Sequence, residues 1–229
     1  MAARDLDGAV VAVVGATGGL GSALVESLTE AGATVVGANR SGGTDVRLDL
    51  RDAGAGDALV AHVREAHGRL DGVVVAAGIV AFGEVTDTDD IVVEELMLTN
   101  AMGPLWLARR VEPLLAESEG FLVNVSGVVA ETPMPSMVAY SASKSAASGA
   151  LRALAKEWRR RRIAVVDVRP PHTETALSSH PLAGTAPQLG EGLAPRAVAD
   201  RIVRAVVDGE RELSGADFGD GQGAAQDPT

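Results

Sequence analysis

Short runs of apolar, mostly β-branched residues alternate along this chain with longer segments in which apolar side chains recur every three or four positions. The short runs have the length of strands, and the longer segments have the periodicity of amphipathic helices. Strands are therefore predicted at residues 10–14, 34–38, 45–48, 72–76, 121–125 and 163–168. Helices are predicted at residues 20–31, 58–66, 92–116, 138–158 and 195–207. Gly103-Pro104 is where the third helix would kink, because proline removes a backbone hydrogen bond.

The predicted strands carry few polar residues. Val10–Val14 and Val73–Val75 are apolar throughout, whereas a strand with one wet face would alternate apolar and polar residues. Such strands are typical of a parallel sheet covered by helices on both faces, joined by right-handed β-α-β crossovers. The expected fold class is α/β, a doubly wound parallel sheet of the Rossmann type in three α/β/α layers. Ligands of such sheets bind at the carboxyl ends of the strands.

The length and composition fit one domain. A chain of 229 residues, 46% of them hydrophobic, can build one substantial core, so residues 1–218 are interpreted as a single domain.

Two segments do not show the alternation of strand and helix patterns seen in the rest of the chain. Residues 170–193 are rich in Pro, Ser, Thr and Gly and are interpreted as a substrate-side loop. Residues 219–229 are rich in Gly, Asp and Gln and are predicted to be disordered.

Charge and cysteine content exclude several functions. The chain has 20 basic and 31 acidic residues, a net charge of −11, which argues against nucleic-acid binding. It has no cysteine, so disulfides, zinc-thiolate sites and thiol nucleophiles are excluded. Its four histidines lack metal-ligand spacing, so no metal is expected. No apolar run is long enough to span a bilayer, and the charged N-terminus does not resemble a signal peptide, so a cytoplasmic protein is expected.

A glycine-rich segment joins the first predicted strand to the first predicted helix. Gly15 would make the tight turn, Gly19 would let backbone N–H groups approach a pyrophosphate, and Gly21 would let the helix pack close to the sheet. The alternative is a glycine-rich turn without a ligand, but the position between strand and helix favours a dinucleotide. The loop residues predicted to bind it are Gly15, Thr17, Gly18, Gly19, Leu20 and Gly21.

The end of the second predicted strand indicates which nucleotide is bound. An acidic residue there would bind the ribose 2′-hydroxyl of NAD, but the sequence reads Asn39-Arg40-Ser41. Arg40 could pair with the 2′-phosphate of NADP, with Asn39 or Ser41 adding hydrogen bonds, so NADP is preferred to NAD. The alternative is an ordinary solvated arginine. Asp49 and Leu50 follow the next strand and are placed to meet the adenine, unless Asp49 only caps a turn.

Tyr140 and Lys144 form a candidate catalytic pair. Tyr140 is the only tyrosine, and Lys144 is one of two lysines. They stand four residues apart at the start of a predicted helix, so both side chains point to one face. A nearby ammonium should lower the pKa of a tyrosine from its free value of about 10, which would let it exchange a proton near neutral pH. The alternative is a surface pair in the first turn of a helix.

The glycine loop and Tyr140-Ser-Ala-Ser-Lys144 together resemble the short-chain dehydrogenase/reductase (SDR) family, over about residues 8–207. Ala76-Ala77-Gly78 resembles the end of the family's Asn-Asn-Ala-Gly motif, and Asn100 falls at its helix asparagine, which holds a water in the proton relay. Residues 170–175 resemble its Pro-Gly-x-Val-x-Thr segment, whose threonine contacts the nicotinamide side. The resemblance implies further cofactor contacts from Ala77, Gly78, Tyr140, Lys144, Pro170, Thr173 and Thr175.

The sequence also departs from the family pattern. The catalytic serine of the family usually lies thirteen residues before the tyrosine, where this chain has Gly127. Ser126 is the nominee to replace it, although it would face the other side of an ideal strand. Thr132 and Ser136 are further substitutes. Val75 replaces the first asparagine of the strand motif and Pro171 replaces the usual glycine, which puts efficient carbonyl reduction in doubt.

The sequence therefore predicts an enzyme, an NADP(H)-dependent oxidoreductase that interconverts a carbonyl and an alcohol by hydride transfer. Tyr140 would be the general acid, Lys144 would tune it and hold the ribose, Asn100 would order a water, and Ser126 would polarise the carbonyl. The alternative, favoured by Gly127, is a catalytically weak NADP(H)-binding protein or subunit. The expected partner is a small carbonyl or alcohol, with no nucleic acid and no membrane. The resemblance implies a homodimer or homotetramer packed through the helices at 92–116 and 138–158.

Overall fold

The computed structural model describes residues 3–219, and their centre is a seven-stranded sheet. Its strands run parallel in the order β3-β2-β1-β4-β5-β6-β7, so the direction of winding reverses between β1 and β4. The predicted α/β fold with a doubly wound parallel sheet is confirmed. The strands are β1 Val10–Val14, β2 Thr34–Asn39, β3 Val46–Arg47, β4 Gly72–Val75, β5 Phe121–Val125, β6 Ala164–Val168 and β7 Glu212–Leu213.

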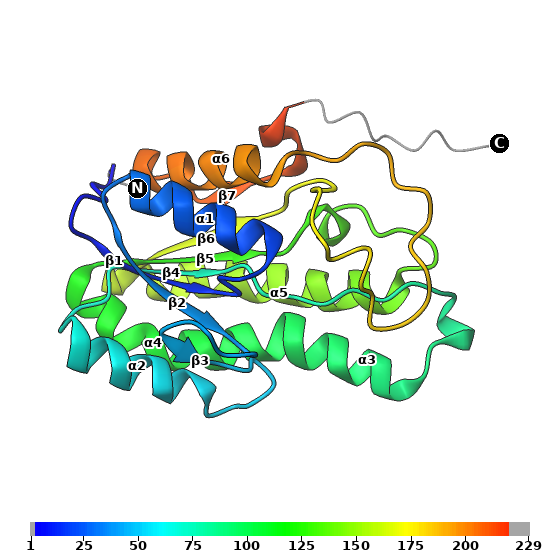
Figure 1. Cartoon of the computed structure of the whole chain (residues 1–229), viewed down its shortest axis with the longest axis horizontal. Helices are drawn as coiled ribbons and strands as arrows, with labels where there is room; N and C mark the ends of the chain where they lie inside the picture. The colour runs from blue at the N-terminus through cyan, green and yellow to red at the C-terminus, as the bar shows by residue number, and fades with distance from the viewer. Residues whose placement is uncertain (1–2, 220–229) are drawn as a thin grey trace.

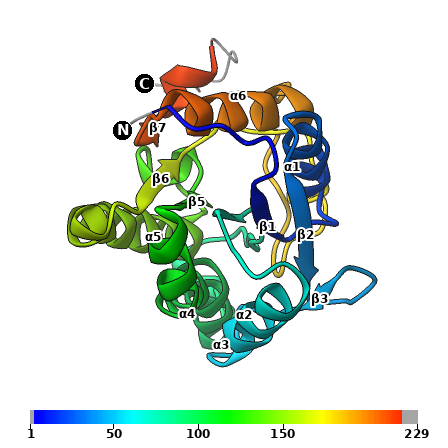
Figure 2. The same ribbon diagram turned by 90° about the vertical axis from the view of Figure 1, so that its left-hand side faces the viewer.

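Helices cover both faces of the sheet in three layers (Figures 1 and 2). On one face α1 packs beside α6, and on the other α2, α4 and α5 lie side by side. The helices are α1 Gly19–Glu30, α2 Ala55–Ala66, α3 Asp90–Met97, α4 Gly103–Ser118, α5 Val138–Glu157 and α6 Pro195–Asp208. None of the helices within residues 3–219 combines the length and the apolar character needed to cross a membrane.

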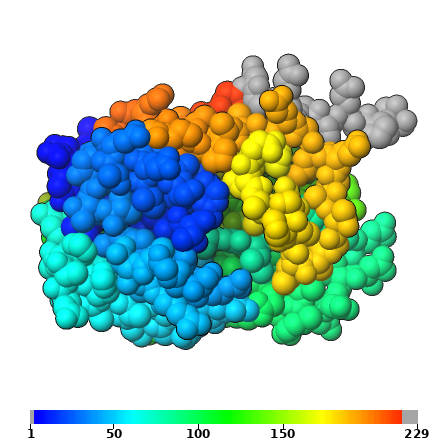
Figure 3. Space-filling view, in the orientation of Figure 1, coloured from blue at the N-terminus to red at the C-terminus, as the bar shows by residue number. Residues whose placement is uncertain are grey.

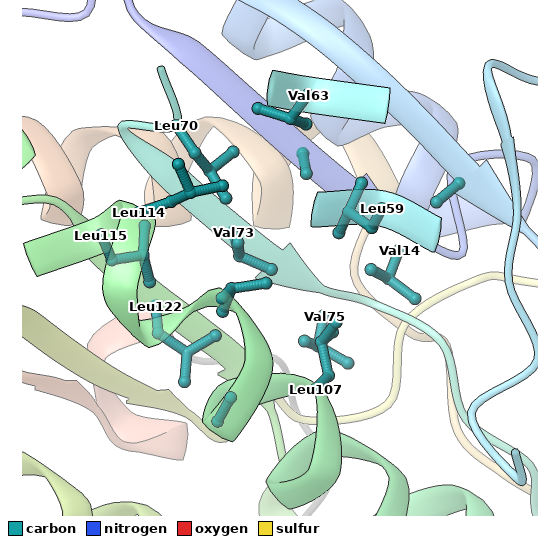
Figure 4. Packing of buried hydrophobic residues seen from close by; sticks show 14 of the residues in the cluster. Val14, Leu59, Val63, Leu70, Val73, Val75, Leu107, Leu114, Leu115 and Leu122 are labelled. Carbon is teal, nitrogen blue, oxygen red and sulfur yellow. The ribbon is translucent and has the colours of Figure 1, made fainter. Parts of the chain in front are cut away.

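Each central strand buries both of its faces, which explains why the sequence shows no alternation there. In β1, Val10 and Val14 point into the cluster formed with α2, α4 and α5, part of which Figure 4 shows. Val11 and Val13 point into the cluster formed with α1 and α6. Burying one such side chain stabilises the fold by roughly 1.5–3 kcal/mol, and these two cores fix the loops that follow the strands.

The long helix predicted at 92–116 is continuous over 90–118 in the structure, with a π-helical turn inside it. α3 ends at Met97, a π-helical turn spans Leu98–Met102, and α4 begins at Gly103. The π-helical turn ends just before Gly103-Pro104, where a kink was expected, and Met102 and Gly103 keep right-handed helical backbone angles. π-helical turns inside helices often occur at functional sites, and this one contains Asn100.

The loop predicted at 170–193 contains no helix and no strand beyond an isolated bridge between Thr173 and Leu193. Backbone hydrogen bonds nevertheless fix it to the segment after β4, from Phe82 N to Ala183 O at 3.0 Å and from Leu182 N to Val80 O at 2.7 Å. It therefore lies over the carboxyl ends of the strands. The tail predicted from residue 219 lies, beyond Gly219, outside the described residues.

Candidate active site

A cleft of about 500 Å³ opens at the carboxyl ends of β1, β2, β4 and β5. Figure 3 shows the surface hollowed between the blue N-terminal part and the yellow loop after β6. The position agrees with the rule that ligands of doubly wound sheets bind where the strand order reverses. Every residue predicted to contact the cofactor lines this cleft, although their binding roles stay predictions. The lining includes Gly15, Thr17, Gly18, Gly19, Leu20, Gly21, Asn39, Arg40, Ser41, Asp49, Leu50, Ala77, Gly78, Tyr140, Lys144, Pro170, Thr173 and Thr175.

The turn from β1 into α1 tolerates only glycine at its two ends. Gly15 has φ +89°, a conformation that side chains disfavour. A Cβ on Gly21 would lie 1.9 Å from the carbonyl oxygen of Gly15, so no side chain fits there. Gly18, the N-cap residue of α1, has no side chain to accept hydrogen bonds from the backbone N–H groups of the first turn. Backbone donors at this helix N-terminus can therefore hold a phosphate, and the cradle fits the pyrophosphate of a dinucleotide.

Two arginines lie near the cleft, Arg40 after β2 and Arg51 after β3. Arg40 is exposed at its rim. Asp49 is paired with Arg51 at 2.7 Å, and this guanidinium, which also contacts Glu95 at 3.0 Å, lowers the pKa of Asp49. Sequence reasoning missed Arg51, because no motif marks it. With Asp49 partnered, Arg40 is left as a cation available to an anionic ligand.

Asn39 fastens the loop after β2 to the glycine loop. Its Nδ2 donates to Thr17 Oγ1 at 2.8 Å, and its Oδ1 accepts from Gly42 N at 2.7 Å. The Asn39 side chain is 6% exposed as a result. It shapes this end of the cleft by holding Thr17 and the backbone beside Arg40 in place.

Tyr140 and Lys144 lie on one face of α5, and both are buried. Lys144 Nζ donates to the carbonyl of Val125 at 2.9 Å and lies 6.0 Å from the centre of the Tyr140 ring. Burial raises the pKa of Tyr140 to about 12 and lowers the pKa of Lys144 to about 8, against an opposing effect of Asp167. The pKa of Tyr140 is therefore raised in the protein alone, where a lowering was expected, because burial disfavours the charged phenolate.

Asn100 connects the site to the π-helical turn from inside the protein. Its Nδ2 donates to Ile79 O at 2.9 Å and to Ser143 Oγ at 3.0 Å, and its Oδ1 accepts from Ile79 N at 3.0 Å. Both amide protons are thus used by protein partners, and Asn100 is 2% exposed. The side chain positions the segment after β4 against α5. Its predicted contact with a relay water stays a prediction.

Ser126 is among the residues that line the cleft, but its hydroxyl is hydrogen-bonded to buried protein groups. Its Oγ donates to Asp167 Oδ1 at 2.5 Å and accepts from Asn124 Nδ2 at 3.2 Å, and the residue is fully buried. Gly127 does line the cleft, and a Cβ there would meet no atom within 4 Å. Thr132 and Ser136 are exposed and are not part of the lining. No hydroxyl therefore stands at the position where the family pattern has its serine.

A buried ionic network, which we call the Asp167 network, lies behind Ser126. Asp167 also accepts from Ser148 Oγ at 2.5 Å and from Arg169 Nη1 at 2.5 Å, and Arg169 pairs with Glu131. Asp167 is 3% exposed and Arg169 is 6% exposed. Sequence reasoning missed this network, and the available signal was Asp167 in an otherwise apolar strand, with Arg169 directly after the strand.

The chain belongs to the short-chain dehydrogenase/reductase family. The family model for short chain dehydrogenases matches residues 9–183. A dehydrogenase/reductase SDR family protein 7-like of Anopheles gambiae is 32% identical, with 92% of this chain and 76% of the relative aligned. A 3beta-hydroxysteroid dehydrogenase of Mediterraneibacter gnavus is 31% identical, with 81% and 73% aligned. These relatives support an oxidoreductase enzyme.

Solved structures share the fold over nearly the whole chain. A short chain dehydrogenase from Burkholderia cenocepacia in complex with NADP has a TM-score of 0.80 and 26% identity, covering 92% of this chain and 89% of the other. A 3-ketoacyl-(acyl-carrier-protein) reductase from Brucella melitensis complexed with NADH has a TM-score of 0.83 and 22% identity, covering 93% and 99%. Structural neighbours thus bind either nucleotide.

Proposed function

We propose that the protein is an NADP(H)-dependent enzyme that interconverts a ketone or aldehyde and its alcohol. The observation that carries the proposal is the placement of Tyr140 and Lys144 in the same cleft as the glycine loop. Purified protein should consume NADPH when carbonyl compounds are added. Absence of turnover on a broad carbonyl panel, with the dinucleotide bound, would contradict it.

The bound nicotinamide would supply or accept the hydride at the carbonyl carbon. Tyr140 then gives its phenolic proton to the carbonyl oxygen, and it is held protonated because burial raises its pKa to about 12. Lys144, fixed against Val125 O, presents a positive charge beside the ring and favours the phenolate left after the transfer. The lid formed by the loop at 170–193 would keep water from the reacting atoms.

Arg40 should decide the choice of nucleotide. Arg40→Gln is expected to raise the Kd for NADPH by about ten- to a hundredfold, the loss of a charged hydrogen bond to a phosphate. The Kd for NADH should stay unchanged, because it lacks the 2′-phosphate. Arg64→Gln removes the same charge from an exposed site outside the cleft and serves as the control. Titration of dinucleotide fluorescence measures both constants, and equal weakening of both nucleotides would contradict the assignment.

We infer that Ser126 positions the turn after β5 and gives no proton to the substrate. Ser126→Ala is expected to keep kcat within about threefold, whereas loss of a carbonyl donor costs on the order of a hundredfold or more. Its free energy of unfolding should fall by about 1 kcal/mol, because Asp167 loses one donor. Ser148→Ala removes the matching donor to the other oxygen of Asp167 and should behave alike in both measurements. A large loss of kcat in Ser126→Ala alone would restore Ser126 as the carbonyl donor.

A second candidate is an NADP(H)-binding protein with little activity. It is favoured by Gly127, which leaves the position of the family serine without a hydroxyl. Tight dinucleotide binding without turnover on any carbonyl would support it.

We also propose a cytoplasmic homodimer or homotetramer that packs through α4 and α5. Exposed apolar side chains at Met102, Leu105 and Val138 support this face. Sedimentation of a monomer at micromolar concentration would contradict it.

A further inference from the structure

The part of the cleft beyond Tyr140 is built from apolar side chains. They come from the segment after β4, the segment before α5 and the loop after β6. The apolar wall consists of Val80, Phe82, Val129, Met134, Met137, Leu177 and Leu189. Several of its members form one buried cluster with Tyr140, so this wall adjoins the proposed proton donor directly.

The charged side chains of the lining lie elsewhere. Among the described residues they are Arg40, Asp49 and Arg51, which follow β2 and β3, and Lys144, whose ammonium is bound to Val125 O. The lining also includes the imidazole of His172, in the loop after β6, which lies 3.5 Å from the carboxylate of Glu174. The apolar wall therefore offers no fixed cation to a carboxylate or a phosphate. A charged group buried without a partner costs several kcal/mol.

The apolar wall is held in place by the backbone. Besides the two hydrogen bonds to Val80 and Phe82, Gly83 N donates to Ser136 O at 2.8 Å. Gly184 packs so closely that a Cβ on it would lie 1.9 Å from Phe82 O. These contacts join the three segments, so the apolar surface is a fixed part of the cleft.

We propose that the substrate is an uncharged ketone or aldehyde, or the corresponding alcohol, whose hydrocarbon body packs against the apolar wall. The inference rests on the proposed oxidoreductase function and adds the substrate class to it. The reaction balances: the hydride of NADPH forms the new C–H bond, the C=O π bond breaks, and the proton of Tyr140 completes the alcohol. Solvent then returns a proton to the tyrosine.

Two matched pairs of ketones test the substrate class. 2-Decanone is compared with 9-oxodecanoate, and 2-acetylnaphthalene with its ring-carboxylated analogue, so that each pair differs only by a carboxylate. With NADPH, kcat/KM should be at least about a hundredfold higher for the neutral member of a pair, since the carboxylate would be buried unpaired. Binding to the NADP-loaded protein is measured in parallel by saturation-transfer NMR.

The possible failures are distinguishable. Binding of a carboxylate as strong as that of its neutral partner, or no binding of either neutral ketone, overturns the substrate class. Neutral ketones that bind at the apolar wall but never turn over leave the substrate class standing and remove the proposed oxidoreductase function.

A charge placed in the apolar wall should alter this preference. Met134→Lys is expected to lower the ratio of kcat/KM between the neutral and the carboxylated ketone by at least about tenfold, because the new ammonium pairs with the carboxylate. Val85→Lys adds the same charge at an exposed position outside the cleft, and its ratio should not change. An unchanged ratio in Met134→Lys, in protein with unchanged thermal stability, would contradict the location of the substrate body.

Discussion

Replacing Tyr140 by phenylalanine is expected to lower kcat for carbonyl reduction by about a hundred- to ten-thousandfold, the usual contribution of a general acid. The ring would still pack against Val80, Phe82 and Met137, so the free energy of unfolding should change little. The substitution removes the phenolic hydroxyl, and with it the proton that would be transferred, but keeps the ring. Steady-state kinetics with NADPH and a saturating ketone measure the effect.

The dinucleotide Kd is the control for this variant. It should rise by no more than about tenfold, because the contacts proposed for the glycine loop and Arg40 are kept and only the contact predicted for the Tyr140 hydroxyl is lost. The wild-type rate should also show no loss from tyrosine ionisation at neutral pH, since the phenol pKa of about 12 keeps the donor protonated. A Tyr140→Phe protein with full activity would require another proton donor and would remove the mechanism proposed above.

The apolar runs predicted the fold because the strands and helices of this fold each leave a local pattern of apolar residues in the sequence. Strands buried on both faces are visible in the sequence, and β1 to β6 lie where predicted, apart from ends that shift by at most one residue. The two-residue strand β7 was missed because it is too short to show a pattern. The π-helical turn at Leu98–Met102 was also missed, because its apolar residues continue the helical periodicity.

The features of the site also fall into those that a local sequence pattern predicts and those that depend on contacts between distant residues. The glycine loop and the Tyr140–Lys144 pair are each contiguous in the sequence, so the two motifs taken together pointed to the site. The direction of Ser126 depends on Asp167, 41 residues away, and Arg169 meets Glu131 across 38 residues. The burial that raises the pKa of Tyr140 likewise comes from three separate segments. Contacts between distant parts of the chain decide these features, and no local pattern encodes them.

The Asp167 network should make the largest single contribution to stability. Asp167→Asn keeps the size of the side chain but leaves the buried Arg169 with one charged partner fewer. It also replaces a carboxylate oxygen by an amide NH2 group, which cannot accept the hydrogen bonds donated by Ser148 and Arg169. Breaking a buried ion pair by removing one partner costs about 3–5 kcal/mol, so the free energy of unfolding should fall by that amount. Chemical denaturation measures it.

Glu117→Gln is the matched control, because it neutralises one partner of the exposed Arg64–Glu117 pair, whose side chains are 54% and 61% exposed. Exposed pairs contribute about 0–1 kcal/mol. Equal, small losses in the two variants would show that Asp167 does not stabilise the fold.

A second measurement separates the electrostatic effect of Asp167 from its structural effect. Asp167 raises the pKa of Lys144 against the burial that holds it near 8. Without this carboxylate the pKa of Lys144 should fall further. On raising the pH, Lys144 would then lose its proton earlier than in the wild type. In the folded Asp167→Asn protein the alkaline limb of the pH–rate profile should therefore move to lower pH, whereas Ser148→Ala, which keeps the carboxylate, should leave it in place. A shift of the same size in both variants would attribute it to packing and not to charge.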